Sequence, residues 1–221
     1  MRRNTLRNLR YKPLATTVSG AARRQLMHPF VQAGMVRNTV TGRQHIHQQR
    51  SCIYIGGPHT SYGDTLLAFG AVRGPVTAVV AGKVFRTAGI RQAFSAAGFV
   101  PTGTGKVVDQ ITTTLRNGHN AMAWAEGKCY TDGVLHDFRN GIFIAAREAG
   151  ALLVPFGHVG VSDWWPLDGR PHIRHKRMEL NFGPAIDTLD YSNSEQGINS
   201  LKAATRQAIS RLSRTPLSED A

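Results

Sequence analysis

The chain has 221 residues, 41% of them hydrophobic, so it can bury one substantial core and does not have the composition of a disordered protein. No apolar run approaches the roughly 18–20 residues of a membrane-spanning helix, and no apolar segment follows Arg2 and Arg3 as it would in a secretory signal. The net charge is +13, and the two cysteines, Cys52 and Cys129, lie in unrelated contexts, which favours a reducing compartment over a disulfide-stabilised fold.

The N-terminal part of the chain is basic, and no acidic residue precedes Asp64. The basic residues before Asp64 are Arg2, Arg3, Arg7, Arg10, Lys12, Arg23, Arg24, Arg37, Arg43 and Arg50. Apolar residues recur between them at helical spacing, at Leu14, Val18, Ala22 and Leu26. This pattern is typical of an amphipathic helix that lies on an anionic membrane surface. A solvated tail and an organelle transit peptide are the alternatives.

These features predict the organisation of the chain. We expect a basic membrane-associating arm over residues 1–35, one folded domain over residues 36–213 and a loose C-terminal tail over residues 214–221. The expected location is cytoplasmic, with peripheral attachment to an anionic lipid surface.

After the arm, short apolar β-branched runs alternate with amphipathic helical patterns. The predicted strands are residues 35–41, 52–55, 76–81, 121–125, 151–156 and 178–182. The predicted helices are residues 65–69, 88–97, 107–115, 142–149 and 195–212, and Gly98 and Gly150 follow two of them as C-caps. The alternation predicts a single α/β domain with a mostly parallel central sheet flanked by helices.

His59 and Asp64 lie at the junction between a predicted strand and a predicted helix, within residues 56–64, which read Gly-Gly-Pro-His-Thr-Ser-Tyr-Gly-Asp. Open α/β sheets present ligands and chemistry at such strand ends. An imidazole oriented by a nearby carboxylate is a general base. A structural interpretation also fits, because Ser61 and Asp64 form an acceptable capping pair for the helix.

Two further segments follow predicted strands, and a parallel sheet brings such segments to one edge. One is the glycine-rich stretch 103–106, which ends at Lys106, and the other is Glu126-Gly127-Lys128. Glycines let backbone amides approach an anion, and lysine supplies the opposite charge. Together with a base, these segments suit a substrate that carries one hydroxyl and one phosphate.

The order of these segments resembles that of the glycerolipid acyltransferases typified by 1-acylglycerol-3-phosphate acyltransferase. The family's His-x-x-x-x-Asp motif is similar to His59–Asp64, and its lysine-to-glycine block is similar to residues 83–100, beginning at Lys83. Its Phe-Pro-Glu-Gly-Thr-Arg block resembles Trp-Ala-Glu-Gly-Lys-Cys at residues 124–129. Two more blocks, at residues 138–155 and 181–186, follow in family order, so the resemblance covers roughly residues 36–212.

The resemblance implies a glycerol-3-phosphate acyltransferase-like fold and an enzyme of phospholipid biosynthesis or remodelling. It would move a fatty acyl group from acyl-CoA or acyl carrier protein to the hydroxyl of a lysophospholipid-like acceptor. His59 would take the proton from that hydroxyl, and Asp64 would orient the imidazole. The substrate-binding residues that the resemblance implies are Ser61, Lys83, Lys106, Glu126, Gly127 and Lys128. No metal or cofactor is expected, because the thioester donor is itself a substrate.

Two departures from the family pattern affect the acceptor. Lys128 and Cys129 stand where Thr-Arg is usual, and the arginine near the end of the second block is absent, with Lys106 the nearest cation. The family associates these positions with the acceptor's phosphate. Lysine does not reproduce the bidentate fork of arginine, so the sequence leaves the acceptor's identity open.

Three alternatives remain at this point. Residues 59–63 resemble a nucleophile elbow, which favours a serine hydrolase with Ser61 as nucleophile. The basic arm also suits nucleic acid, although that function leaves the downstream blocks unexplained and no nucleic-acid partner is expected. Trp164 and Trp165 form either a lipid-facing patch or a cover over the core.

Overall fold

The computed structural model describes residues 38–46, 49–72, 76–82, 99–167, 169, 172 and 177–218. The strands are β1 (Asn38–Thr41), β2 (Cys52–Gly57), β3 (Val76–Val80), β4 (Val100–Pro101), β5 (Asn120–Trp124), β6 (Leu152–Val159), β7 (Met178–Phe182) and β8 (Ile186–Asp187). The helices are α2 (Tyr62–Ala71), α4 (Val107–Arg116), α5 (Asn140–Ala149), α6 (Val161–Trp164) and α7 (Glu195–Ser213), with 3-10 turns η1 (Arg43–His45) and η3 (Thr188–Asp190).

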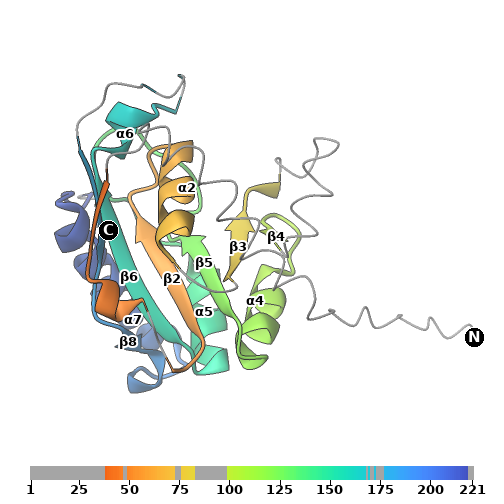
Figure 1. The fold of residues 1–221 in the computed structure, drawn as a ribbon. Coiled ribbons are helices and arrows are strands. Elements are labelled where there is room, and N and C mark those ends of the chain that lie inside the picture. Colours follow the sequence, from red (N-terminus) through yellow and green to blue (C-terminus); the bar gives the residue numbers. More distant parts are fainter. Residues whose placement is uncertain are drawn as a thin grey trace, which may run out of the picture.

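The strands form one sheet in the order β1-β7-β6-β2-β5-β3-β4, and β8 pairs with β6 off this path (Figure 1). Neighbouring strands are parallel except that β6 runs antiparallel to β7 and β8. The predicted fold class, an α/β domain with a mostly parallel central sheet, is confirmed.

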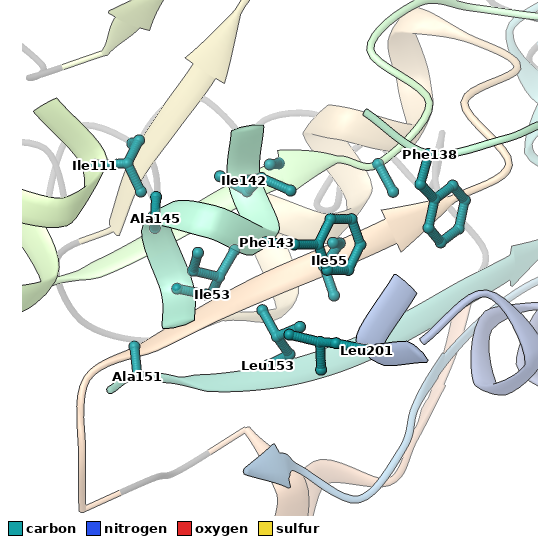
Figure 2. Packing of buried hydrophobic residues seen from close by; sticks show 14 of the residues in the cluster. Ile53, Ile55, Ile111, Phe138, Ile142, Phe143, Ala145, Ala151, Leu153 and Leu201 are labelled. Atoms are coloured by element: carbon teal, nitrogen blue, oxygen red, sulfur yellow. The ribbon is translucent and has the colours of Figure 1, made fainter. Parts of the chain in front are cut away.

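Helices cover both faces of the sheet. The central strand β2 is buried between them, and for this reason its sequence is apolar throughout. Ile53 and Ile55 pack with α4, α5 and α7 on one face (Figure 2). Cys52 and Tyr54 pack with α2 and α6 on the other face. All four side chains are at most 1% exposed, as expected for a parallel strand buried on both sides.

Strands β5 and β6 flank β2 and both run parallel to it, so the carboxyl ends of the three strands lie together. The register aligns Gly56 with Trp124 of β5 and Gly57 with Gly157 of β6. A Cβ atom at Gly56 would lie 2.2 Å from the ring of Phe156, so the packing of this ring against β2 requires glycine there. The residues that leave these three ends therefore share one edge of the sheet.

Several element boundaries differ from the sequence-based expectation. Strand β2 was expected to end before the glycines, but it continues through them to Gly57. Residues 178–182 are not the last strand, because β8 follows and adds to β6. The short elements β4 and α6 were not predicted, because two and four residues carry no readable periodicity. The predicted helix 88–97 and the basic arm lie outside the described residues.

The C-terminal tail also differs, within residues 214–218. The backbone N–H of Leu135 donates to the carbonyl of Pro216 at 2.8 Å, and that of Ser218 donates to the carbonyl of Leu135 at 3.1 Å. The Arg206 guanidinium donates to Ser218 Oγ at 2.7 Å. These contacts tie the segment to the domain, where a loose tail was expected.

Trp164 belongs to the core, with 1% of its surface exposed, so it covers the sheet rather than facing lipid. Within the described ranges, no helix combines the length and apolar character needed to cross a bilayer.

Candidate active site

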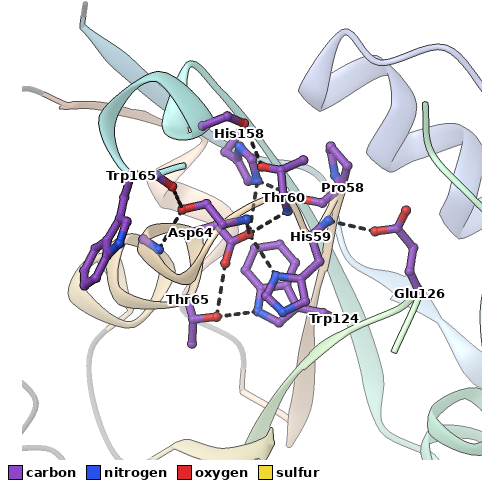
Figure 3. A network of polar contacts seen from close by, with 12 residues as sticks. Pro58, His59, Thr60, Asp64, Thr65, Trp124, Glu126, His158 and Trp165 are labelled. Atoms are coloured by element: carbon purple, nitrogen blue, oxygen red, sulfur yellow. Dashed lines mark hydrogen bonds and ion pairs between the residues drawn. The ribbon is translucent and has the colours of Figure 1, made fainter. Parts of the chain in front are cut away.

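His59 and Asp64 meet at the carboxyl end of β2, directly before and inside the first turn of α2 (Figure 3). The His59 Nδ1 atom lies 2.9 Å from Asp64 Oδ2. The Asp64 carboxylate is completely buried, whereas 17% of the His59 side chain is exposed. The pair thus joins an inaccessible charge to a ring that a ligand can reach.

The same carboxylate also starts the helix. Asp64 Oδ2 accepts the backbone N–H groups of Thr60 and Ser61, both at 3.0 Å, and the Ser61 hydroxyl accepts the N–H of Gly63 at 2.9 Å. This reciprocal arrangement is a capping box. Asp64 is therefore both the helix cap and the partner of His59, because one oxygen serves both.

A second histidine, His158 of β6, lies on the other side of Asp64. Its Nε2 atom is 3.7 Å from Asp64 Oδ2 and 2.7 Å from the carbonyl oxygen of Pro58. Burial lowers the pKa of His158 more strongly than Asp64 raises it, so this ring is neutral. A neutral Nε2–H donates to Pro58 and adds no second positive charge beside His59.

Trp124, the last residue of β5, holds the plane of the His59 ring. The two rings are stacked with centroids 4.8 Å apart and an interplanar angle of 6°. The indole N–H donates to Thr65 Oγ1 at 2.8 Å, and that hydroxyl donates to Asp64 Oδ1 at 3.1 Å. The stack and this chain of bonds orient the imidazole and its carboxylate together.

The environment of His59 favours its charged form. Burial alone lowers the pKa of the ring, but the hydrogen bond and charge of Asp64, with a contribution from nearby Cys129, outweigh it and raise the pKa to about 10. In the ligand-free chain the ring is therefore an imidazolium at neutral pH, paired with the carboxylate.

This shift predicts a pH dependence of stability. Because the pKa is raised above the value of about 6.5 expected in the unfolded chain, the stabilisation is complete below about pH 6.5. It decreases as the pH rises and is lost on passing through about 10. Urea unfolding of the wild type and the His59→Gln variant over this range measures it. A difference in free energy of unfolding that stays constant with pH would contradict the prediction.

Glu126 follows β5 and is 1% exposed. Its Oε2 accepts the backbone N–H of His59 at 2.7 Å, and its Oε1 accepts that of His136 at 3.0 Å. Burial raises the pKa of Glu126, and the two N–H donors partly offset this. The carboxylate therefore fixes the backbone that carries His59, and its oxygens are engaged within the fold.

Replacing Glu126 by glutamine tests this clamp, by which we mean the two hydrogen bonds that Glu126 accepts from the backbone of His59 and His136. The two N–H groups bond to different oxygens of the carboxylate, and glutamine replaces one of these oxygens by an NH2 group. One buried donor is therefore left unpaired, and the free energy of unfolding falls by about 1–3 kcal/mol. The exposed Glu195 in the first turn of α7 is the control, with an expected loss below about 1 kcal/mol for Glu195→Gln. Equal, small losses in both variants would argue against a clamp.

Cys129 lies near His59 and contributes to the raised pKa of that ring. The backbone supports this placement, since the N–H of Tyr130 donates to the carbonyl of His59 at 2.8 Å. In the sequence, Cys129 was a departure from a family pattern and Trp124 was the first residue of the same block, with no role for either, and His158 was not indicated. Their only sequence signal is position, because each lies at or just after the carboxyl end of a strand next to β2.

The predicted binding residues are dispersed. The Ser61 hydroxyl is fully buried, caps α2 and donates to the carbonyl of Trp165, so no exposed serine nucleophile stands there. Lys106 is exposed at the start of α4, and β4 lies three strand spacings from β2, roughly 14 Å. Lys128 is exposed, with its ammonium 4.4 Å from the centroid of the Tyr130 ring. Lys83 lies outside the described residues.

Gly127 occupies the turn after Glu126 with a φ of 72°, a left-handed conformation that favours glycine. In the part of the chain that the structure describes, no group of three or more His, Cys, Asp or Glu is placed to hold a metal ion. The chemistry available at this edge is thus that of a histidine paired to a buried carboxylate.

Comparison with known proteins adds independent findings. The family model described as Acyltransferase matches residues 37–159, more than half of the chain. The fold is similar to the crystal structure of the 1-acyl-sn-glycerophosphate (LPA) acyltransferase, PlsC, from Thermotoga maritima, with a TM-score of 0.65 and 19% identity. That similarity covers 87% of this chain and 81% of the other. None of the curated protein sequences compared matches the chain.

Proposed function

This chain belongs to the acyltransferase family, and from that premise we propose that it transfers a fatty acyl group from an acyl thioester to the hydroxyl of a lysophospholipid-like acceptor. The observation that best supports this function is the His59–Asp64 pair, which has a 2.9 Å bond at a strand end and a partly exposed ring. The similarity in fold to an LPA acyltransferase supports the class of acceptor. The product would be a phospholipid or its precursor.

His59 and Asp64 have the roles of base and orienting group in this proposal. The neutral ring takes the proton of the acceptor hydroxyl as the oxygen attacks the acyl carbon, and Asp64 stabilises the imidazolium that forms. Such proton transfer accelerates a reaction by about 10²–10⁴. The free chain holds the ring protonated, so the neutral form must be generated within the catalytic cycle.

The acceptor's phosphate would meet the cationic groups on the same edge of the sheet. Lys128 is exposed after β5, the neighbour of β2, and the Gly127 turn beside it suits an anion, whereas Lys106 is exposed farther along this edge, after β4. We propose that Lys83, by its place after β3, contributes to the same site. Glu126 would act through the backbone of His59 rather than by touching the acceptor.

A panel of lysophospholipids assayed with one labelled acyl thioester tests the function. The donor is supplied first as acyl-CoA and then as acyl carrier protein thioester, and the lipid product is separated and counted. We expect a labelled diacyl product from at least one acceptor with a phosphate. Hydrolysis of the donor without any acylated lipid would refute acyl transfer and restore the hydrolase alternative.

We also propose that the basic arm binds an anionic lipid surface and so brings the domain to its acceptor. Each Lys or Arg at such a surface contributes about 1 kcal/mol, and residues 1–35 contain seven. Removing these residues should weaken sedimentation with phosphatidylglycerol vesicles and leave binding to neutral phosphatidylcholine vesicles unchanged. Undiminished binding to the anionic vesicles would show that the arm is not the anchor.

A further inference from the structure

His158 is the one ionisable side chain of β6, and it is buried in a strand whose other residues are apolar or glycine. A buried polar group is costly unless it finds a hydrogen-bond partner, so the partner indicates what the group does. Here the partner is the carbonyl oxygen of Pro58, 2.7 Å from Nε2 (Figure 3). Because a carbonyl oxygen can only accept, Nε2 carries the proton and donates it.

Strand register brings His158 and Glu126 to Pro58 from opposite sides of β2. The last register pair of β2 with β6 is Gly57 with Gly157, so the next residue, His158, comes level with Pro58. Glu126 lies two residues beyond the pairing of β5 with β2 and comes level with Pro58 from the other side. Two buried polar side chains from the two flanking strands therefore meet the chain just before the catalytic ring.

The two side chains hold the same peptide unit. His158 donates to the carbonyl oxygen of Pro58, and Glu126 accepts the N–H of His59 at 2.7 Å. The carbonyl oxygen of His59 accepts the N–H of Tyr130 at 2.8 Å. Every polar backbone atom from the carbonyl of Pro58 to that of His59 is thus bonded, so the backbone that carries the imidazole is fixed from both flanking strands.

His158 does this without competing for the carboxylate of Asp64. Its Nε2 lies 3.7 Å from Asp64 Oδ2, too far for a hydrogen bond, whereas His59 Nδ1 lies 2.9 Å from the same oxygen. The proton of His158 is directed to Pro58 instead. Asp64 is therefore left to orient the ring of His59, while His158 holds the backbone behind it.

We propose that His158 is a positioning residue of the active site, which together with Glu126 holds the peptide unit between Pro58 and His59 so that the imidazole meets the acceptor hydroxyl in the reactive geometry. This inference rests on the proposed function. Because His158 is buried, it acts on the rate through the placement of His59 and not by contact with a substrate. A misplacement of about 1 Å in a reacting group costs about 10²-fold in rate.

Asparagine and glutamine at this position separate the hydrogen bond from the burial of a polar group. The amide nitrogen of glutamine reaches as far along the side chain as Nε2 of histidine, whereas that of asparagine reaches only as far as Nδ1. His158→Gln should therefore keep the bond to Pro58, and His158→Asn should lose it. Both variants bury the same amide group, so each is the matched control of the other.

The first measurement is steady-state acylation of lipid with the donor and acceptor that the wild type uses. We expect His158→Asn to lower kcat by about 10²-fold and to leave KM for both substrates unchanged, because no substrate contact is lost. His158→Gln should restore most of kcat. His119→Asn, at the opposite edge of the sheet, should keep the wild-type kcat.

The second measurement does not depend on activity. Hydrogen exchange of the His59 amide, followed by nuclear magnetic resonance, reports how firmly the N–H is held against Glu126. In the wild type this amide should be protected although it lies in a loop. Its exchange should become faster in His158→Asn and stay near the wild-type rate in His158→Gln. Circular dichroism verifies that each variant is folded.

The outcomes separate this inference from the proposed function. Equal kcat in wild type, His158→Asn and His158→Gln would overturn the positioning role. Equal losses in both variants would overturn it too, because the rate would then depend on the ring and not on the bond to Pro58. A wild-type His59 amide that exchanges as fast as an unstructured peptide would also overturn it, without any variant. If the wild type acylates no acceptor at all, the proposed function fails, and the hold on the peptide unit is decided by hydrogen exchange alone.

Discussion

Replacing His59 by alanine is expected to abolish acyl transfer and leave the domain folded. The proposed reaction needs the imidazole to move a proton, and its removal costs about 10²–10⁴ in rate. The fold should survive because Asp64 keeps its other donors, the N–H groups of Thr60 and Ser61. The measurement is the initial rate of lipid acylation, together with far-ultraviolet circular dichroism and thermal unfolding.

His119 provides the control for this variant. It immediately precedes β5, so it lies at the opposite edge of the sheet from His59. His119→Ala should acylate lipid at the wild-type rate. Retention of more than about a tenth of the rate by a folded His59→Ala protein would exclude His59 as the proton-transfer group.

Asp64→Asn is expected to have the second-largest effect. The amide keeps the shape of the side chain and one oxygen for the capping N–H groups, but it removes the buried negative charge that faces His59. The rate should fall within the same range, about 10²–10⁴, because the ring loses its orienting charge. The pKa of His59 should fall as well, since Asp64 is a main cause of its elevation.

The fall in the pKa of His59 distinguishes positioning from a purely structural role. Nuclear magnetic resonance titration of the His59 ring in wild type and variant measures it, and a cap that acted only on the helix would leave it unchanged. Asp64→Ala removes the cap too, and should cost about 1–3 kcal/mol of stability beyond the loss of activity. The exposed Asp109 in the first turn of α4 is the control, and Asp109→Asn should change neither rate nor titration.

The sequence presented the structural and catalytic interpretations of Asp64 as alternatives, and the structure combines them. The capping carboxylate of Asp64 is buried at the N-terminus of α2, and His59, two residues before the N-cap Ser61, lies within hydrogen-bond reach of it. The six residues from His59 to Asp64 thus suffice to build both the start of α2 and the pair between the histidine and the carboxylate. For this reason the local motif was readable without knowledge of the fold.

Local patterns also sufficed for the fold class. The apolar run at β2, the 3.6-residue periodicity of α4 and α7, and the glycine after α5 depend on short-range physics that sequence displays directly. Family resemblance then placed the blocks in order, and the match over residues 37–159 agrees with it.

Only the tertiary structure decided which residues surround His59. The register that aligns Gly57 with Gly157 brings His158 to Asp64 across about a hundred residues of chain. The pairing of β2 with β5 turns Glu126 toward the backbone of His59 and brings the Trp124 ring onto the His59 ring. No periodicity encodes such contacts, because strand register depends on how the whole sheet packs. The sequence determined that a histidine and an aspartate meet at a strand end, and the packing of the sheet decided which thiol, ring and carboxylate surround them.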